Sequence, residues 1–199
     1  MDNYINKVIQ GDCLEVMKNI PDKSIDLIIT DPPYGLGKKM KGGSWGVTAT
    51  ENKIMLEWDS FIPTKEYFDE MLRISKNQII WGGNYYSLPP SRCWLAWIKP
   101  NFPSASDFEL AWTSFDKTSK MFKESRNPDG KRQHPTQKPV SLMQWCIEKY
   151  SKEGQIILDP FAGSGTTGVA CKNTNRNYIL IEKEPEYIDI INNRLHVTP

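Results

Sequence analysis

The chain of 199 residues has little excess charge of either sign, since 25 Lys and Arg residues stand against 24 Asp and Glu residues, a formal net charge of +1. This balance excludes a histone-like or polybasic protein that holds nucleic acid through bulk charge. A local basic groove remains compatible with it, because electrostatic steering depends on where charges lie. The sequence also has no internal repeats or low-complexity segments. Its length suits one domain, and we expect residues 1–199 to form a single one.

Metal-ligand patterns, signal peptides and membrane spans are also missing. The 4 cysteines form no CxxC pair and only 2 histidines accompany them, whereas structural zinc sites usually have closely spaced ligand pairs. We therefore expect no metal site, and reduced, mostly buried thiols as in cytosolic proteins. No basic segment followed by an apolar run opens the chain, and no stretch approaches about 18 apolar residues. A soluble protein of the cytoplasm is predicted.

What the chain does contain is a hydrophobic fraction of 39%, with 7 Trp, 8 Tyr and 7 Phe residues. That is enough for a packed core, and it leaves rings available to stack on a flat ligand. Apolar runs alternate with helical periods, which favours an α/β fold. Strands are predicted at 7–10, 25–30, 78–81, 94–98, 108–113, 155–158 and 178–181. Helices are predicted at 14–19, 65–76, 140–150, 165–173 and 185–195, with Thr64 as an N-cap and Pro139 in a first turn. Long loops are predicted at 35–58 and 116–135, and such loops are usually functional or mobile.

A glycine-rich segment, DPFAGSGTTG at 159–168, lies between a predicted strand and a predicted helix, where such loops bind ligands. Its glycines satisfy G-x-G-x-x-G, and Glu182 follows at the end of the next strand. Alone, this pattern indicates either a dinucleotide site, in which the acid takes the ribose hydroxyls, or a helix-starting turn without a ligand. Asp159 would repel a pyrophosphate and attract an ammonium group, which favours S-adenosylmethionine over NAD. Because only about one more strand can follow, we expect a Rossmann-like, doubly wound, mostly parallel sheet in permuted order.

A second motif, Asp31-Pro32-Pro33-Tyr34, directly follows the apolar run at 25–30. The two prolines fix φ and hold the chain extended. A carboxylate, a rigid carbonyl and an aromatic ring are thus presented at the carboxyl end of a strand, where open α/β sheets bind substrates. This set suits the exocyclic amine of a planar base. Asp31 and the Pro32 carbonyl accept its two N–H groups, Tyr34 stacks on the ring, and the nitrogen lone pair faces an electrophilic methyl group. The alternative is a proline turn with an N-cap-like Asp.

With these motifs the chain resembles the amino-group DNA methyltransferases of the permuted, beta-class motif order, and most of all their small phage- or prophage-type members. The resemblance covers almost the whole chain, and it rests on four motifs in the order of the family. They are GDCLE at 11–15, DPPY at 31–34, HPTQKP at 134–139 and DPFAGSGTT at 159–167. The segment WGGNY at 81–85 and the short chain also match the small members.

The resemblance implies a site-specific DNA methyltransferase of the S-adenosylmethionine-dependent fold, acting on adenine N6 by base flipping in a bacterial or phage-infected cell. The methyl group would pass directly to the amine, whose proton leaves afterwards. The catalytic residues implied are Asp31, Pro32, Pro33 and Tyr34. The cofactor residues implied are Asp12, Cys13, Asp31, Thr136, Gln137, Lys138, Asp159, Phe161, Ala162, Gly163, Ser164, Gly165, Thr166, Thr167 and Glu182. Among them, Asp12 and Cys13 would border the adenine, Glu182 the ribose, and residues 136–138 the methionine end. The resemblance leaves a homodimer open.

Two basic segments are candidate DNA contacts. One lies in the predicted loop at 35–58, just after the DPPY motif, and is either a phosphate-binding lid or a solvated loop. The other lies in the predicted loop at 116–135, where the family has its target-recognition region. It is shorter than in many members, which puts recognition of a specific DNA sequence in question. Trp81 is the best candidate for a ring that faces the site, with a core position as its alternative. The DNA-contacting residues predicted are Lys38, Lys39, Lys41, Trp81, Lys131 and Arg132.

Several alternatives stay open. Methylation of cytosine N4 is the nearest, although cytosine members more often carry Ser where this chain has Asp31. RNA adenine methyltransferases share the four DPPY residues, whereas protein glutamine methyltransferases typically have Asn in place of Asp31 and an unpermuted order. An NAD-dependent dehydrogenase leaves the DPPY motif unexplained. A catalytically silent nucleic-acid-binding module is disfavoured because both reactive motifs are intact.

Overall fold

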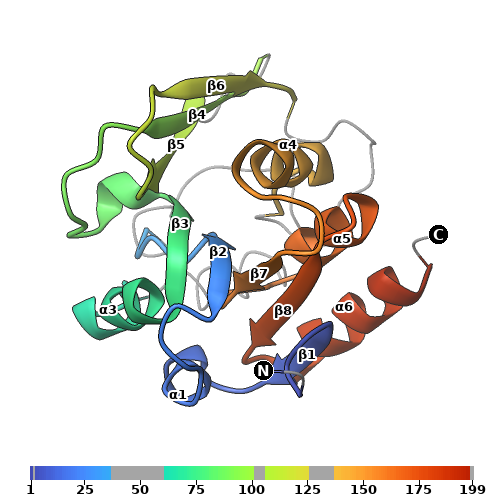
Figure 1. Cartoon of the computed structure of the whole chain (residues 1–199). Helices are drawn as coiled ribbons and strands as arrows, with labels where there is room; N and C mark the ends of the chain where they lie inside the picture. Colours follow the sequence, from blue (N-terminus) through green and yellow to red (C-terminus); the bar gives the residue numbers. More distant parts are fainter. Residues whose placement is uncertain (2, 37–60, 101–105, 126–136, 198–199) are drawn as a thin grey trace.

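The computed structural model describes residues 1, 3–36, 61–100, 106–125 and 137–197 (Figure 1). Within these residues, eight strands form one sheet in the order β1-β8-β7-β2-β3-β5-β4-β6. The strands are β1 (Lys7–Gln10), β2 (Ile25–Thr30), β3 (Ser75–Trp81), β4 (Trp94–Ile98), β5 (Phe108–Thr113), β6 (Lys120–Lys123), β7 (Ile156–Asp159) and β8 (Asn177–Glu182). The helices are α1 (Cys13–Met17), α3 (Lys65–Ile74), the 3-10 turn η2 (Gly83–Tyr85), α4 (Val140–Tyr150), α5 (Thr166–Asn173) and α6 (Pro185–Val197).

The sheet is mostly parallel, as predicted. Strands β1, β8, β7, β2 and β3 pair parallel to one another. Strand β5 is antiparallel to both β3 and β4, and β6 is parallel to β4. The strand that precedes the glycine-rich loop, β7, lies between β8 and β2 although it comes late in the chain. The chain therefore moves outward in opposite directions after β2 and after β7, which makes the β2–β7 junction the topological switch point where α/β folds bind ligands.

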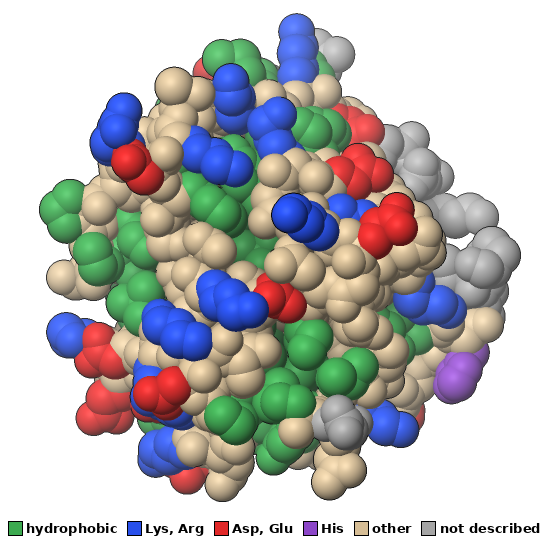
Figure 2. All heavy atoms as spheres, in the orientation of Figure 1, with side chains coloured by type: hydrophobic (Ala, Val, Ile, Leu, Met, Phe, Trp, Pro, Cys, Tyr) green, Lys and Arg blue, Asp and Glu red, His purple; other side chains and the backbone are tan. Residues whose placement is uncertain are grey.

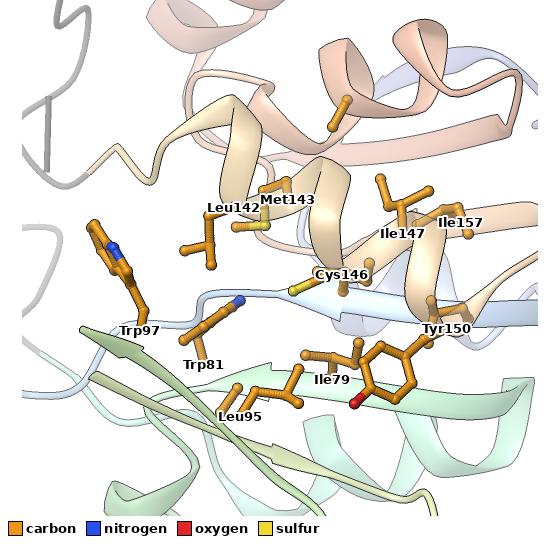
Figure 3. Packing of buried hydrophobic residues seen from close by; sticks show 14 of the residues in the cluster. Ile79, Trp81, Leu95, Trp97, Leu142, Met143, Cys146, Ile147, Tyr150 and Ile157 are labelled. Atoms are coloured by element: carbon orange, nitrogen blue, oxygen red, sulfur yellow. The ribbon is translucent and has the colours of Figure 1, made fainter. Parts of the chain in front are cut away.

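Helices cover both faces of the sheet (Figure 1). Along β2, Leu27 and Ile29 face α4 and α5, while Ile28 faces α1 and α3. This alternation is that of a strand buried on both faces, and it explains the nearly continuous apolar run at 25–30. Helix α6 joins the α4–α5 side through Leu180 of β8 and its own Ile191. Figure 3 shows how α4 packs onto the sheet through Leu142, Met143, Cys146 and Ile147, opposite Ile79, Trp81 and Leu95.

Helix starts follow the sequence more closely than helix ends, since the helix predicted at 65–76 ends at Ile74 and Ser75 begins β3. Helix α3 begins after Thr64, which is its N-cap but makes no side-chain capping bond. Helix α4 begins after Pro139, which occupies the N-cap instead of the predicted first turn. Among the described residues, no helix has both the length and the apolar character needed to cross a membrane. All four cysteines are free and buried.

Strand β6 is the element that the sequence prediction missed, since residues 116–135 were expected to form a loop. It has four residues, KMFK, and pairs with β4 on one side only. Met121 is 73% exposed, so the segment has the short, lysine-flanked character of an edge strand and no buried apolar run to reveal it. The predicted loop at 35–58 lies almost wholly outside the described residues.

The core under α4 gives a first prediction. Replacing the fully buried Ile147 with Ala leaves a cavity between α4 and the sheet, and we expect it to lower the free energy of unfolding by about 2–5 kcal/mol. Urea denaturation followed by circular dichroism measures the change. Glu148→Ala, at an exposed position of the same helix, is the matched control, and an equal loss in both variants would contradict the packing described.

Candidate active site

Acidic side chains gather at one edge of the sheet. Asp31 follows β2, Asp159 ends β7 and Glu182 ends β8, and the parallel pairing brings these carboxyl ends to the same edge. Asp12 lies just beyond β1, which pairs with β8 up to Glu182. Strand β5 runs the other way, so its beginning, with Glu109, reaches this edge as well.

Two hollows open at this edge. The larger has a volume of about 530 Å³, and Asp12, Cys13, Pro33, Phe161 and Glu182 are among its lining residues. The smaller, of about 40 Å³, is lined by Asp31, Gln137, Lys138, Met143, Asp159, Phe161, Ala162, Gly163, Ser164, Thr166 and Thr167. Phe161 lines both. Most of the predicted cofactor residues are thus brought together around two hollows that share Phe161, whereas Gly165 lines neither and packs against Ile191.

Sequence reasoning missed three aromatic rings of the larger hollow, Phe61, Tyr67 and Tyr187. Tyr67 extends from α3, and its ring lies 6.0 Å from that of Phe161 at an interplanar angle of 35°. Its hydroxyl reaches Asp12 Oδ1 at 3.4 Å. Tyr67 lies in α3, Tyr187 in α6 and Phe61 in the segment before α3, all outside the motifs, so no motif in the sequence indicated them.

The Glu182 carboxylate is held by backbone donors. Its Oε2 accepts from Gly163 N at 2.7 Å, and its Oε1 accepts from Lys183 N at 2.8 Å and Glu184 N at 2.9 Å. Burial raises the pKa of Glu182, and these hydrogen bonds oppose the increase. Gly163 turns toward the carboxylate with φ +51, a conformation that glycine adopts without strain. Because a carboxylate has about four lone-pair sites, Glu182 keeps capacity for a further donor.

The Asp159 carboxylate joins three parts of the site. Asp159 Oδ1 accepts from Thr30 Oγ1 at 2.8 Å and from Phe161 N at 3.1 Å, and Oδ2 accepts from Thr167 Oγ1 at 2.6 Å. Burial raises the pKa of Asp159 to about 6, against the effect of these bonds. The bonds tie β2, the glycine-rich loop and α5 together. In this structure Asp159 therefore positions the glycine-rich loop. The ammonium partner predicted for it from the sequence remains a prediction.

A second anchor of the glycine-rich loop comes from α6. Arg194 Nη1 donates to Ser164 O at 2.6 Å, Ser164 Oγ at 2.9 Å and Thr166 Oγ1 at 3.2 Å. An arginine in the last turn of a helix is usually a favourable partner of the helix end. Its sequence position therefore gave no sign of this contact with the loop.

The DPPY segment is held in one conformation by tyrosines. Tyr34 Oη donates to Asp31 Oδ1 at 2.5 Å, and Tyr86 Oη donates to the carbonyls of Pro32 at 2.8 Å and Pro33 at 3.1 Å. The Tyr34 ring stacks on that of Tyr85, with centroids 5.0 Å apart and an interplanar angle of 20°. Gly82 lies beside the same ring. A Cβ there would stand 2.2 Å from Tyr34 Cε1, and its φ of +70 also requires glycine.

Lys138 bonds directly to the DPPY carboxylate. Its Nζ donates to Asp31 Oδ2 at 2.5 Å and to Tyr34 Oη at 3.2 Å, and it lies 3.1 Å from Glu109 Oε2. Burial raises the pKa of Asp31, and the charge of Lys138 opposes this. Glu109 also pairs with Lys99 at 3.0 Å. Burial alone would raise the pKa of Glu109, but Lys138 and Lys99 outweigh it and lower that pKa to about 2.

Comparison with known proteins decides the family. The sequence profile of the N6_N4_Mtase family, described as DNA methylase, matches residues 80–193. The chain belongs to this family. It is 28% identical to the Type II methyltransferase M.HinfI of Haemophilus influenzae, over 98% of this chain and 69% of that protein. It is 31% identical to YubD of Escherichia coli K12, over 92% of this chain and 87% of that protein. The crystal structure of the M1.HpyAVI–SAM complex superposes with a TM-score of 0.62 at 26% identity, over 96% of this chain and 99% of that one.

One predicted DNA contact of the methylase is wrong. Trp81 is 0% exposed and lies in the core beneath α4 (Figure 3), so its ring offers no surface for a base. Its face instead lies 5.5 Å from Lys138 Nζ, a cation–π contact. The other predicted DNA contacts, Lys38, Lys39, Lys41, Lys131 and Arg132, lie outside the described residues, as does the predicted cofactor residue Thr136.

Titration of Asp159 gives the second prediction. A folded pKa of about 6 exceeds the unfolded value of about 3.9, so the native methylase binds more protons than the unfolded chain between these values. The contribution of Asp159 to the free energy of unfolding should then fall as the pH rises from about 4 to about 6 and level off above. In Asp159→Asn this dependence disappears. The stability of the variant relative to the parent should rise across that range by an amount on the order of 3 kcal/mol.

Urea denaturation at intervals from about pH 4 to about pH 7 measures this difference. Asp189→Asn, at an exposed position of α6, controls for loss of a surface charge. A difference between Asp159→Asn and the parent that stays constant with pH would show that Asp159 is not titrating as described.

Proposed function

We propose that this DNA methyltransferase transfers a methyl group from S-adenosylmethionine to the exocyclic N6 of adenine in DNA. The observation that carries the proposal is the position of the Asp31 carboxylate and the Pro32 carbonyl at the end of β2, where Asp31 lines the smaller hollow and Pro33 lines the cavity of about 530 Å³. Two hydrogen-bond acceptors fixed next to a cofactor-sized space match the needs of an amine that must be aimed at a methyl donor.

The larger cavity fits the adenosine part of S-adenosylmethionine. Its volume falls within the range of about 300–1,000 Å³ that small-molecule sites occupy. Tyr67 and Phe161 supply flat walls for the adenine, and Glu182 has the remaining acceptor capacity to bind ribose hydroxyls. Asp12, Glu184 and Glu186 make the lining acidic, with Lys183 as its basic member, which disfavours a cofactor that carries phosphates. The smaller hollow, which includes Gln137 and Ser164, would take the methionine part. When bound, S-adenosylmethionine supplies an electrophilic methyl group on a sulfonium.

The DPPY residues would hold the target amine. One N–H would bond to Asp31 and the other to the Pro32 carbonyl. Tyr34, Lys138 and Tyr86 already donate to these two groups, but a carboxylate and a carbonyl each accept more than one bond. With both N–H groups engaged, the nitrogen lone pair would be left to bond the methyl carbon, while the broken C–S bond leaves its electron pair on sulfur as a neutral thioether. The excess proton leaves the nitrogen afterwards, so no strongly basic side chain is required.

The target base would have to leave the duplex, since N6 inside a stacked helix is out of reach. Tyr34 would then stack on the flipped base in place of Tyr85, the 43% exposed ring that stacks on Tyr34 in this structure. Figure 2 shows Lys and Arg side chains gathered over the β4–β6 end of the molecule, where Lys120 and Lys123 are exposed. We propose that DNA is held there together with Lys38, Lys39, Lys41, Lys131 and Arg132.

Identification of the methylated base tests the proposal. The protein is incubated with radiolabelled S-adenosylmethionine and unmethylated duplex DNA, and the DNA is digested to nucleosides. We expect labelled N6-methyladenine. Labelled N4-methylcytosine would replace adenine with cytosine as the target, and label in RNA alone would change the substrate. No label in any nucleic acid would contradict the proposal. Sedimentation with and without DNA distinguishes a monomer from the homodimer that the resemblance leaves open.

Asp31→Ala tests the role of the carboxylate. Without this acceptor the amine is no longer held or aimed, and we expect the transfer rate to fall by about 10³-fold or more. Binding of S-adenosylmethionine, measured by calorimetry, should fall far less than the transfer rate, by about tenfold at most, because Asp31 lines only the smaller hollow and the larger cavity is unchanged. Asp189→Ala at the surface is the control. Activity that survives in Asp31→Ala would mean that the site is assigned wrongly.

A further inference from the structure

The Asp31 carboxylate is one end of a line of four alternating charges. Lys138 Nζ lies 2.5 Å from Asp31 and 3.1 Å from Glu109, which in turn lies 3.0 Å from Lys99 Nζ. The Lys138 and Lys99 side chains are only 4% and 5% exposed. The two buried ammonium groups balance the charge of the two carboxylates. Glu109 and Lys99 have no part in the proposed binding of the cofactor or the base.

Lys138 is fixed from several sides. Its three N–H donors have three oxygen partners, on Asp31, Tyr34 and Glu109. The faces of Trp81 and Tyr34 lie 5.5 and 5.8 Å from its Nζ. An ammonium so enclosed cannot turn to solvent, and its distance from Asp31 depends on how strongly the other partners attract it.

Of the partners of Lys138, Glu109 is the one that a strand of the sheet holds in place. It lies within β5, where its pairing with Trp97 of β4 fixes its height along the sheet. Lys99, just beyond β4, is tied to the same pair of strands by its own N–H bond to Asp107 O at 2.8 Å. The second carboxylate that attracts Lys138 is therefore part of the sheet.

We infer that Glu109 is a positioning residue for methyl transfer. By sharing the Lys138 ammonium, it keeps Asp31 oriented and able to accept the target amine, while Lys99 balances the charge of Glu109. The inference deepens the proposed function and rests on it, because it presumes that Asp31 holds the amine. Without Glu109, Lys138 would pair with Asp31 alone and compete with the amine for the carboxylate. Stability is a weak explanation for such a line of charges, since buried ion pairs often contribute little net stability.

The charges around Asp31 predict that loss of the Glu109 charge and loss of the Lys99 charge shift the pKa of Asp31 in opposite directions. The titratable groups that face Asp31 are Tyr34 in its own loop, Lys138 before α4, Glu109 on β5 and Asp159 on β7. The negative charge of Glu109 raises the pKa of Asp31, so its removal should lower that pKa. Removal of the Lys99 charge leaves Glu109 unbalanced and should raise it.

Glu109→Gln and Lys99→Gln therefore form a matched pair, with Glu148→Gln at an exposed position of α4 as control. Single-turnover methyl transfer is measured as a function of pH, and the Asp31 carboxyl is titrated by ¹³C NMR, with assignment from Asp31→Asn. In Glu109→Gln we expect the acid limb of the rate profile to move to lower pH and the plateau rate to fall about 10- to 100-fold. In Lys99→Gln the acid limb should move to higher pH. Glu148→Gln should match the parent.

A purely structural role would lower the melting temperature and leave the acid limb and the plateau rate per folded molecule unchanged. That result, or a shift of both variants in the same direction, would overturn the inference. If one variant fails to fold, the direction of the shift in the other still decides. If the parent transfers no methyl group to nucleic acid, the proposed function fails, whereas the NMR titration needs no substrate and still tests the effect of Glu109 and Lys99 on Asp31.

Discussion

The hydrogen bond from Thr30 Oγ1 to Asp159 Oδ1, at 2.8 Å, joins the two halves of the site. Thr30 is the last residue of β2 and Asp159 the last of β7. Because Thr30 immediately precedes the DPPY motif and Asp159 opens the glycine-rich loop, one buried bond sets the proposed amine-binding segment beside the proposed cofactor segment. The pairing of β2 with β7 brings these ends together, and the bond fixes their final spacing. The other bonds of Asp159, to Phe161 N and Thr167 Oγ1, extend this connection into α5.

The sequence predicted the parts of the site that are contiguous along the chain. The DPPY segment and the glycine-rich loop each follow an apolar strand, so their motif and their position at the sheet edge could be read together. Glu109, Lys99, Tyr86 and Arg194 could not be found this way. Each reaches the site only through long-range pairing or packing, and the local sequence around Glu109 reads as an ordinary strand. Trp81 was misjudged for the same reason, because its burial depends on α4, which is distant in sequence.

The near-zero net charge also has a different meaning once the fold is known. Acidic side chains of Asp12, Glu182, Glu184 and Glu186 line the larger hollow, and lysines are exposed on β6. The sum of +1 thus averages over surfaces of different sign. For a methyltransferase with a cationic cofactor and a polyanionic substrate, the separation of charge matters more than its total, because each ligand responds to the local potential.

The carboxylates at this edge of the sheet differ in pKa because their hydrogen-bond and charge partners differ. Asp159 receives hydrogen bonds from neutral groups, and burial raises its pKa to about 6. Glu109 lies between two ammonium groups, which lower its pKa to about 2. Asp31 stands between these cases, since burial raises its pKa and Lys138 opposes the increase. An acceptor for a substrate amine needs that intermediate environment: a carboxylate surrounded by cations would hold the amine weakly, and one without a cation would take up a proton. For the role proposed for Asp31, the Lys138 ammonium shared with Glu109 meets both requirements, which gives the second carboxylate a physical reason.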